Sequence, residues 1–153
     1  MAVTQAHPAA RSGNLAKHRS QNPLQRRLLA QFHARIAALT ADALTGGPAA
    51  PRVVEVGCGE GFVLAALGEH LPRTRYLGLE LRAEALPLAA AQAPHAGLGR
   101  ADALRLPLAD AAADVTLCLE VLEHLPDPWA AVRELLRVTR GSLIVSEIGR
   151  AHV

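Results

Sequence analysis

Short apolar runs and segments with helical spacing of apolar residues alternate along most of the chain. Runs rich in Val and Leu predict β-strands over residues 53–56, 76–79, 98–101, 115–119 and 142–145. Apolar residues at helical spacing predict helices over residues 62–70, 83–92 and 129–138. Strands that alternate with helices form a parallel sheet with helices on both faces. The pattern therefore predicts an α/β protein, a Rossmann-like three-layer αβα sandwich with a mostly parallel sheet. Residues 106–113 have no strong period and form a loop or a short helix.

The first fifty residues have a different pattern. Residues 1–21 are polar, lack a hydrophobic period and are predicted to be disordered or loosely attached. Asn22 is a good N-cap and Pro23 suits the first position of a helix. Apolar residues then recur at helical spacing as Leu24, Leu28, Phe32, Ile36 and Leu39. They predict an amphipathic helix over residues 22–45 that docks on the sheet, ahead of a main domain over residues 52–146.

Composition narrows the class of protein. A chain of 153 residues suits one domain, and an aromatic share of 3% requires a core of Leu, Val and Ala. The net charge of +2 argues against a polyanionic partner, and Arg26 and Arg27 alone make no nucleic-acid surface. No apolar run is long enough to span a membrane, and no signal-peptide pattern opens the chain. Cys58 and Cys118 match no zinc spacing and suit the reducing cytoplasm.

The segment Gly57-Cys58-Gly59-Glu60-Gly61 joins the first predicted strand of the main domain to a helix. Alternate glycines let the backbone turn sharply and let a ligand approach it closely. The helix that follows presents free N–H groups at its first turn. The combination predicts a site for a nucleotide-type ligand.

Two acidic residues follow predicted strands, where open α/β sheets place their ligands. Glu80 ends the second strand, where its carboxylate suits a ribose diol or, alternatively, a surface salt bridge with Arg82. Asp102 follows the third strand, where it suits the exocyclic amine of adenine or, alternatively, a turn or a helix N-cap.

Glu120, Glu123 and His124 crowd the turn after the fourth strand. A zinc helix of the His-x-x-Glu-His type needs histidine where Glu120 stands, and no third ligand is evident, so we expect no metal. Glu120 suits an ammonium group or shapes the pocket. His124 is either a general base or a loop histidine bonded to the backbone.

Residues 53–61, 76–80, 101–103 and 114–128 together resemble the successive motifs of class I S-adenosylmethionine-dependent methyltransferases. The similarity is greatest to the small-molecule enzymes whose fourth strand reads like Cys118-Leu119-Glu120-Val121-Leu122-Glu123-His124-Leu125, and it covers about residues 52–146. It implies methyl transfer from S-adenosylmethionine to a small molecule, and we expect the N-terminal helix to cover the cofactor. Glu55 and the glycine loop would hold the methionine part, Glu80 the ribose, Asp102 and Ala103 the adenine, and Glu120 would lie beside the methionine end. The implied cofactor-binding set is Glu55, Gly57, Cys58, Gly59, Gly61, Glu80, Leu81, Asp102, Ala103 and Glu120. For a hydroxyl or amine acceptor, His124 is the candidate base.

Two other functions are compatible with parts of this pattern. A nicotinamide-dependent oxidoreductase needs glycine at the first, third and sixth positions of the loop, and the sixth position here is Phe62. A non-catalytic member of the same fold would bind the cofactor without turnover.

The end of the chain departs from the family pattern. Family members continue past the fifth strand with a helix and an antiparallel pair of strands, which the resemblance leaves missing here. Residues 147–153 read as the in-frame translation of a sequencing-library adapter, so we expect a truncated reading frame with a non-native tail. The fifth strand would then be an exposed apolar edge that invites self-association.

Overall fold

The computed structural model describes residues 13–146. The predictions of disorder for residues 1–12 and of a non-native tail at residues 147–153 lie outside the described residues. The elements in chain order are α1 (Gly13–His18), α2 (Pro23–Ala43), β1 (Arg52–Val56), α3 (Phe62–His70), β2 (Arg75–Glu80), α4 (Leu86–Gln92), β3 (Gly97–Arg100), β4 (Ala113–Leu119), the 3-10 helix η1 (Leu122–His124), α5 (Pro128–Val138) and β5 (Thr139–Ser146).

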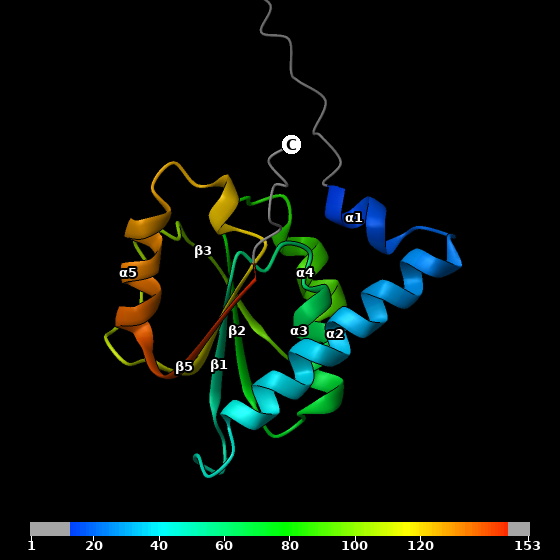
Figure 1. Ribbon diagram of the computed structural model, residues 1–153. Helices are drawn as coiled ribbons and strands as arrows, with labels where there is room; N and C mark the ends of the chain where they lie inside the picture. The colour runs from blue at the N-terminus through cyan, green and yellow to red at the C-terminus, as the bar shows by residue number, and fades with distance from the viewer. Residues whose placement is uncertain (1–12, 147–153) are drawn as a thin grey trace, which may run out of the picture.

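The five strands form one parallel sheet in the order β3-β2-β1-β4-β5. Helices α2, α3 and α4 cover one face and α5 covers the other, which confirms the predicted α/β sandwich (Figure 1). The strand order reverses between β1 and β4. Open α/β sheets bind ligands at this switch point, outside the carboxyl ends of the strands.

Strand residues alternate between two apolar layers. Val53, Val115 and Leu117 pack toward α2 and α3, whereas Val54 and Cys118 pack toward α5. All five side chains are fully buried. Burial on both faces explains why the strands read as continuous apolar runs. Among residues 13–146, no helix combines the length and apolarity needed to cross a membrane.

Helix α2 begins where Asn22 and Pro23 predict. Oδ1 of Asn22 accepts hydrogen bonds from the backbone N–H groups of Leu24 (2.9 Å) and Gln25 (3.4 Å). The helix packs mainly against α3 and only partly against β5, rather than lying directly on the sheet as predicted. Ile36 is buried in the core, but Leu24 and Leu28 are 64% and 57% exposed. The first half of the apolar stripe therefore extends beyond the core.

The prediction of disorder is wrong for residues 13–18, which form α1. The ring of His18 stacks on Phe62 with centroids 3.8 Å apart, and Nζ of Lys17 lies 3.7 Å from Oε2 of Glu120. These contacts come from distant parts of the chain, so a search for local periodicity has no means of finding them.

Residues 106–112 form a loop rather than a helix. The Arg137 guanidinium, on α5, donates hydrogen bonds to the carbonyl oxygens of Leu106 (3.1 Å) and Leu108 (2.7 Å). Glu134 accepts a hydrogen bond from the N–H of Leu106 at 2.8 Å. Two helix side chains therefore satisfy the backbone of this loop. A separate difference from the prediction concerns α4. This helix begins at Leu86 rather than at residue 83, with Pro87 in its first turn.

Gly61 offers a stability test with a matched control. Its φ is +82°, and an added Cβ would lie 2.9 Å from Cα of Ala89, so α3 and α4 could not pack as closely. Gly46 has a φ of +74° and open space around the same position. We expect Gly46→Ala to lower the free energy of unfolding in urea by about 1 kcal/mol and Gly61→Ala by about 3 kcal/mol. Equal losses of unfolding free energy in the two variants would show that the close approach of α3 to α4 at Gly61 adds nothing to the destabilisation.

Candidate functional site

A cavity of about 810 Å³ opens at the carboxyl ends of the strands, at the switch point of the sheet. Its walls come from the glycine loop, the ends of β1, β2 and β4, the segment after β3, and the two N-terminal helices. Every residue of the predicted cofactor set except Gly61 lines it. Gly61 contacts Ala89 instead, so its place in the structure is to bring α3 and α4 together.

The glycine loop is tied to the end of β2. The backbone N–H of Gly59 donates a 2.8 Å hydrogen bond to Oε2 of Glu80, and the N–H of Arg82 donates a 2.9 Å bond to Oε1. The carboxylate of Glu80 is buried and also lies 3.4 Å from Nε of Arg82. The alternative of a salt bridge with Arg82 is therefore present, and the same carboxylate holds the loop. Gly57 fits beneath Val121, since an added Cβ would lie 2.3 Å from Cγ2 of that residue.

Glu55 is the least satisfied polar group of the site. Its side chain is 3% exposed, and its Oε2 has no hydrogen-bond partner among residues 13–146. Burial, together with the negative charge of Glu80, raises the pKa of Glu55 to about 8. A buried carboxyl with an unpartnered oxygen, on a residue that lines a cavity, fits a ligand that brings a positive charge or a donor. Burial and the same carboxylates raise the pKa of the Cys58 thiol to about 12, so Cys58 is a neutral wall residue.

The adenine side of the predicted site is more open. Oδ1 of Asp102 accepts a 2.9 Å hydrogen bond from the N–H of Leu104, which is the turn role that the sequence also allowed. Asp102 is exposed and still borders the cavity, beside the buried Ala103. Leu81 is 51% exposed and forms part of the rim.

Glu120 and His124 line the cavity from the segment that follows β4. Glu120 has a left-handed backbone conformation, with a φ of +55°, and its carboxylate meets Lys17 of α1. Such a conformation is uncommon outside glycine and is found at functional sites. His124 is exposed in η1 and borders the cavity. Within residues 13–146, no group of three or more His, Cys, Asp or Glu residues is arranged to hold a metal ion.

The individual residues of the wall contributed by α1 and α2 were not predicted. Lys17, His18, Gln25, Leu28, Leu29, Phe32 and His33 all line the cavity. The sequence predicted a helix over most of this segment and placed it near the cofactor, but it gave no individual residue a role. His18 and His33 are 15 residues apart, and only the fold brings their rings together.

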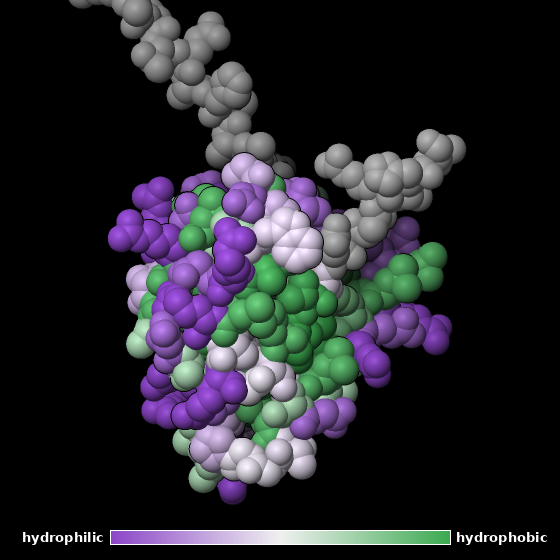
Figure 2. Space-filling model, turned by 60° about the vertical axis from the view of Figure 1, so that its left-hand side comes forward, coloured by the Kyte–Doolittle hydropathy of each residue, from purple (hydrophilic) through white to green (hydrophobic). Residues whose placement is uncertain are grey.

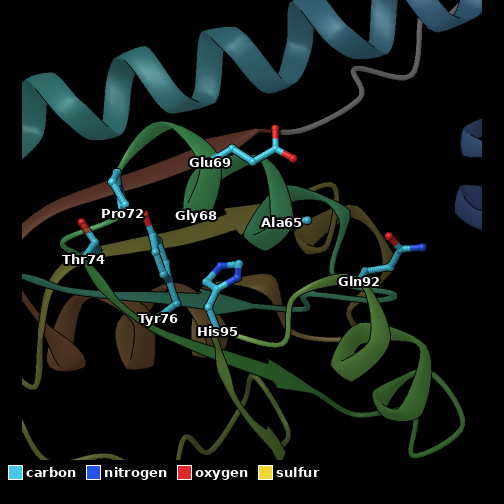
Figure 3. A pocket seen from close by; sticks show the side chains of 8 residues that line it. All are labelled: Ala65, Gly68, Glu69, Pro72, Thr74, Tyr76, Gln92 and His95. Atoms are coloured by element: carbon cyan, nitrogen blue, oxygen red, sulfur yellow. The ribbon is translucent and has the colours of Figure 1, made fainter.

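A second cavity, of about 450 Å³, lies away from this site between α3, β2 and the segment after α4 (Figure 3). The hydroxyl of Tyr76 donates toward the carbonyl oxygens of Leu67 (3.0 Å) and Leu71 (2.9 Å), and Nε2 of His95 lies 3.0 Å from the carbonyl oxygen of Leu64. The two rings meet edge to face at 5.4 Å. The Tyr76 hydroxyl and Nε2 of His95 therefore hold the start of β2 and the segment after α4 against α3 and the residue that follows it.

An open parallel sheet with a glycine loop at its switch point and acidic residues at successive strand ends defines the Rossmann-like α/β class, which places its ligands at this point of the sheet. A family model described as a methyltransferase domain matches residues 54–145, more than half of the chain. This chain belongs to that methyltransferase-domain family.

Individual relatives agree with this assignment. An uncharacterized methyltransferase of Mycobacterium leprae is 35% identical over 138 residues, covering 86% of this chain and 51% of that protein. One of Mycobacterium avium is 37% identical over 138 residues, covering 82% and 53%. The chain thus spans about half the length of these curated relatives.

Solved structures share the fold. An S-adenosylmethionine-dependent methyltransferase of Mesorhizobium loti superimposes with a TM-score of 0.57 and 26% identity, covering 65% of this chain and 49% of that one. The [4+2]-cyclase SpnF superimposes with a TM-score of 0.64 and 26% identity, covering 74% and 44%. Because this neighbour is named a cyclase, the fold does not by itself assign methyl transfer.

Proposed function

We propose that this protein binds S-adenosylmethionine and transfers its methyl group to a small molecule. The observation that carries the proposal is the buried Glu55, which lines the cavity at the switch point and whose Oε2 has no hydrogen-bond partner in the described chain. The α-ammonium group of the cofactor is a partner of the right charge for that carboxylate. Family membership and the relatives named methyltransferases support the same assignment.

Residues at different strand ends would each bind a different part of the cofactor. Glu55 and the loop from Gly57 to Gly59 would take the methionine part, with Glu120 beside it. Glu80 would accept hydrogen bonds from the ribose hydroxyls, and Asp102 with Ala103 would take the adenine. When bound, the cofactor supplies a methyl group already activated on a positively charged sulfur. The chain therefore has to bind the cofactor and the acceptor, orient them toward each other and exclude water.

The test follows the methyl group. The protein is incubated with S-adenosylmethionine carrying a labelled methyl group and a mycobacterial extract, which is then separated into small-molecule, protein and nucleic-acid fractions. We expect the label in the small-molecule fraction, and none with a Glu80→Ala variant. Label in protein or nucleic acid would contradict the acceptor class. Cofactor binding with no label in any fraction would favour a non-catalytic binding protein.

We also propose that the edge strand β5 mediates self-association. β5 is the last strand of the described sheet, and Val145 is 41% exposed on it. Figure 2 shows an apolar patch on this face of the molecule, beside α5, where Leu136 is 58% exposed. An uncovered apolar edge strand invites pairing with another chain, and lysine on such an edge opposes it.

The corresponding prediction concerns Val145→Lys. We expect the wild-type protein to sediment as oligomers at micromolar concentration and Val145→Lys to shift it toward monomer. Arg133→Lys, at an exposed position of α5, is the control that adds no charge to the edge. A monodisperse wild-type monomer would contradict the proposal.

We further propose a cytoplasmic location, because Cys58 and Cys118 are both free and buried in the described structure, as expected in a reducing compartment.

A further inference from the structure

One exposed face of α2 carries both apolar and cationic side chains. Leu24, Arg27, Leu28, Gln31 and Arg35 share this face because their spacings follow the helical repeat, and all five are exposed. Leu24 and Leu28 are 64% and 57% exposed. The helix packs on α3 with its other side. Nothing in the described structure therefore covers these leucines.

Positive charge is concentrated in the same part of the chain. Residues 13–41 contain five Lys or Arg residues and no Asp or Glu, whereas residues 42–146 contain nine Lys or Arg and thirteen Asp or Glu. The net charge of +2 averages these two regions and hides their separation. None of the salt bridges among residues 13–146 involves Arg27 or Arg35. The exposed face of α2 therefore offers cations that no described carboxylate has engaged.

Leucines and arginines on one exposed face suit an anionic lipid surface. Leucine side chains enter the boundary between the headgroups and the acyl chains, while the long arginine side chains keep their charge among the headgroups. The arginines are also attracted by the negative surface potential of anionic lipids. A nucleic acid would bind the arginines through its phosphates and leave the two leucines in water. The combination therefore favours lipid over nucleic acid.

The exposed face of α2 reaches the mouth of the switch-point cavity. Leu28 belongs to this face and also lines the cavity, and Leu81, which is 51% exposed, lines the same cavity. The N-terminal half of α2 projects away from the sheet together with α1 (Figure 1). A projecting helix can contact a flat surface without a clash from the rest of the domain. Contact through this face would bring the cavity mouth next to that surface.

We propose that the exposed face of α2 docks the protein reversibly on an anionic lipid surface, with the cavity mouth beside the lipid. The helix lies in the plane of the interface, with its leucines in the apolar boundary and its arginines among the headgroups. The apolar contact and the charge attraction act together, and added salt screens the second of them. This inference goes beyond the proposed methyl transfer and does not depend on it.

Flotation with lipid vesicles in a density gradient tests the proposal, because protein that only self-associates does not float. We expect the full chain to float with vesicles of phosphatidylcholine and phosphatidylglycerol in equal parts at about 0.1 M salt. Binding to pure phosphatidylcholine should be at least about tenfold weaker, and about 1 M salt should release the protein from the anionic vesicles. Equal binding to the two kinds of vesicle, or binding to neither, would overturn the proposal.

Variants of exposed residues show whether α2 is the docking element. We expect Arg27→Gln and Arg35→Gln each to weaken binding to anionic vesicles about fivefold. Leu24→Gln should weaken it about fivefold or more, because an apolar contact is lost. Leu136→Gln and Arg133→Gln, at exposed positions of α5, are the matched controls and should bind like the wild type. Circular dichroism establishes that each variant is folded, and equal losses in the α2 and α5 variants would overturn the proposal.

The single tryptophan of the chain gives a second readout. Trp129 is 72% exposed on α5, on the opposite face of the sheet from α2 (Figure 1). If α2 docks, acrylamide should quench Trp129 fluorescence equally with and without anionic vesicles. Protection of Trp129 by the vesicles would place the docking surface on α5 and overturn the proposal. Binding to duplex DNA at about 0.1 M salt without flotation would likewise overturn it, in favour of a nucleic-acid surface.

Discussion

Glu80→Ala will weaken S-adenosylhomocysteine binding by roughly 100-fold or more. The Glu80 carboxylate accepts hydrogen bonds from the N–H groups of Gly59 (2.8 Å) and Arg82 (2.9 Å), and it would accept the ribose hydroxyls as well. Each hydrogen bond to a charged group contributes about 1.5–3 kcal/mol, and 1.4 kcal/mol corresponds to a factor of ten in affinity. The alanine variant loses the ribose contact and also frees the loop that shapes the methionine site. Isothermal titration calorimetry measures the loss.

Two further variants make the result specific. Glu84→Ala removes an exposed carboxylate four residues away and should bind with wild-type affinity. Glu80→Gln keeps one oxygen acceptor, so we expect a loss of roughly tenfold. Circular dichroism establishes that each variant is folded before titration. Wild-type affinity in folded Glu80→Ala would remove the ribose role from this residue.

Glu55 will make the unliganded protein less stable as the pH rises. Its pKa is about 8 in the fold because of burial and of Glu80, against an ordinary value of 4.5. Between these values the folded chain holds a proton that the unfolded chain has released. The contribution of Glu55 to the free energy of unfolding is fully present below pH 4.5, where both states hold the proton, and it falls from pH 4.5 toward pH 8. Because one pKa unit corresponds to 1.36 kcal/mol, the shift from 4.5 to about 8 makes the fall attributable to Glu55 on the order of 5 kcal/mol.

The Glu55→Gln variant isolates this contribution. It keeps the side-chain volume and cannot ionise, so its stability relative to the wild type should improve steadily between pH 5 and pH 8 in urea unfolding. Its S-adenosylhomocysteine affinity should fall, because the ammonium group loses its carboxylate. For the wild type, affinity should rise with pH toward 8 as ligand binding releases the Glu55 proton. Parallel stability curves for the two proteins would contradict the buried, protonated carboxyl.

Local signals in the sequence account for most of the sheet and for the core of the site. Apolar runs buried on both faces identify β1 and β4, and the alternate glycines before Phe62 identify the loop at the switch point. The position of Glu80 at the cavity was predictable because it ends the second strand, and strand ends meet at the switch point; its role toward a ribose stays a prediction. In each case the signal lies within one element or one turn.

The remaining features depend on contacts between distant segments. Helix α1 is held by the stacking of His18 on Phe62, which lies in a different helix far along the chain. The loop that follows β3 is satisfied by Arg137, about thirty residues later in the chain. Gly61 matched the loop motif, but its position against Ala89 depends on the packing of α3 and α4. These contacts form only in the folded chain, so residue patterns alone do not reveal them.

The most direct test of the proposed function is a calorimetric titration of S-adenosylhomocysteine into folded protein, with NADH as the competing ligand class. We predict a dissociation constant in the micromolar range for S-adenosylhomocysteine and no heat of binding for NADH. Folded protein that binds NADH, or that leaves S-adenosylhomocysteine unbound, would contradict the assignment of the switch-point cavity to a methyl donor.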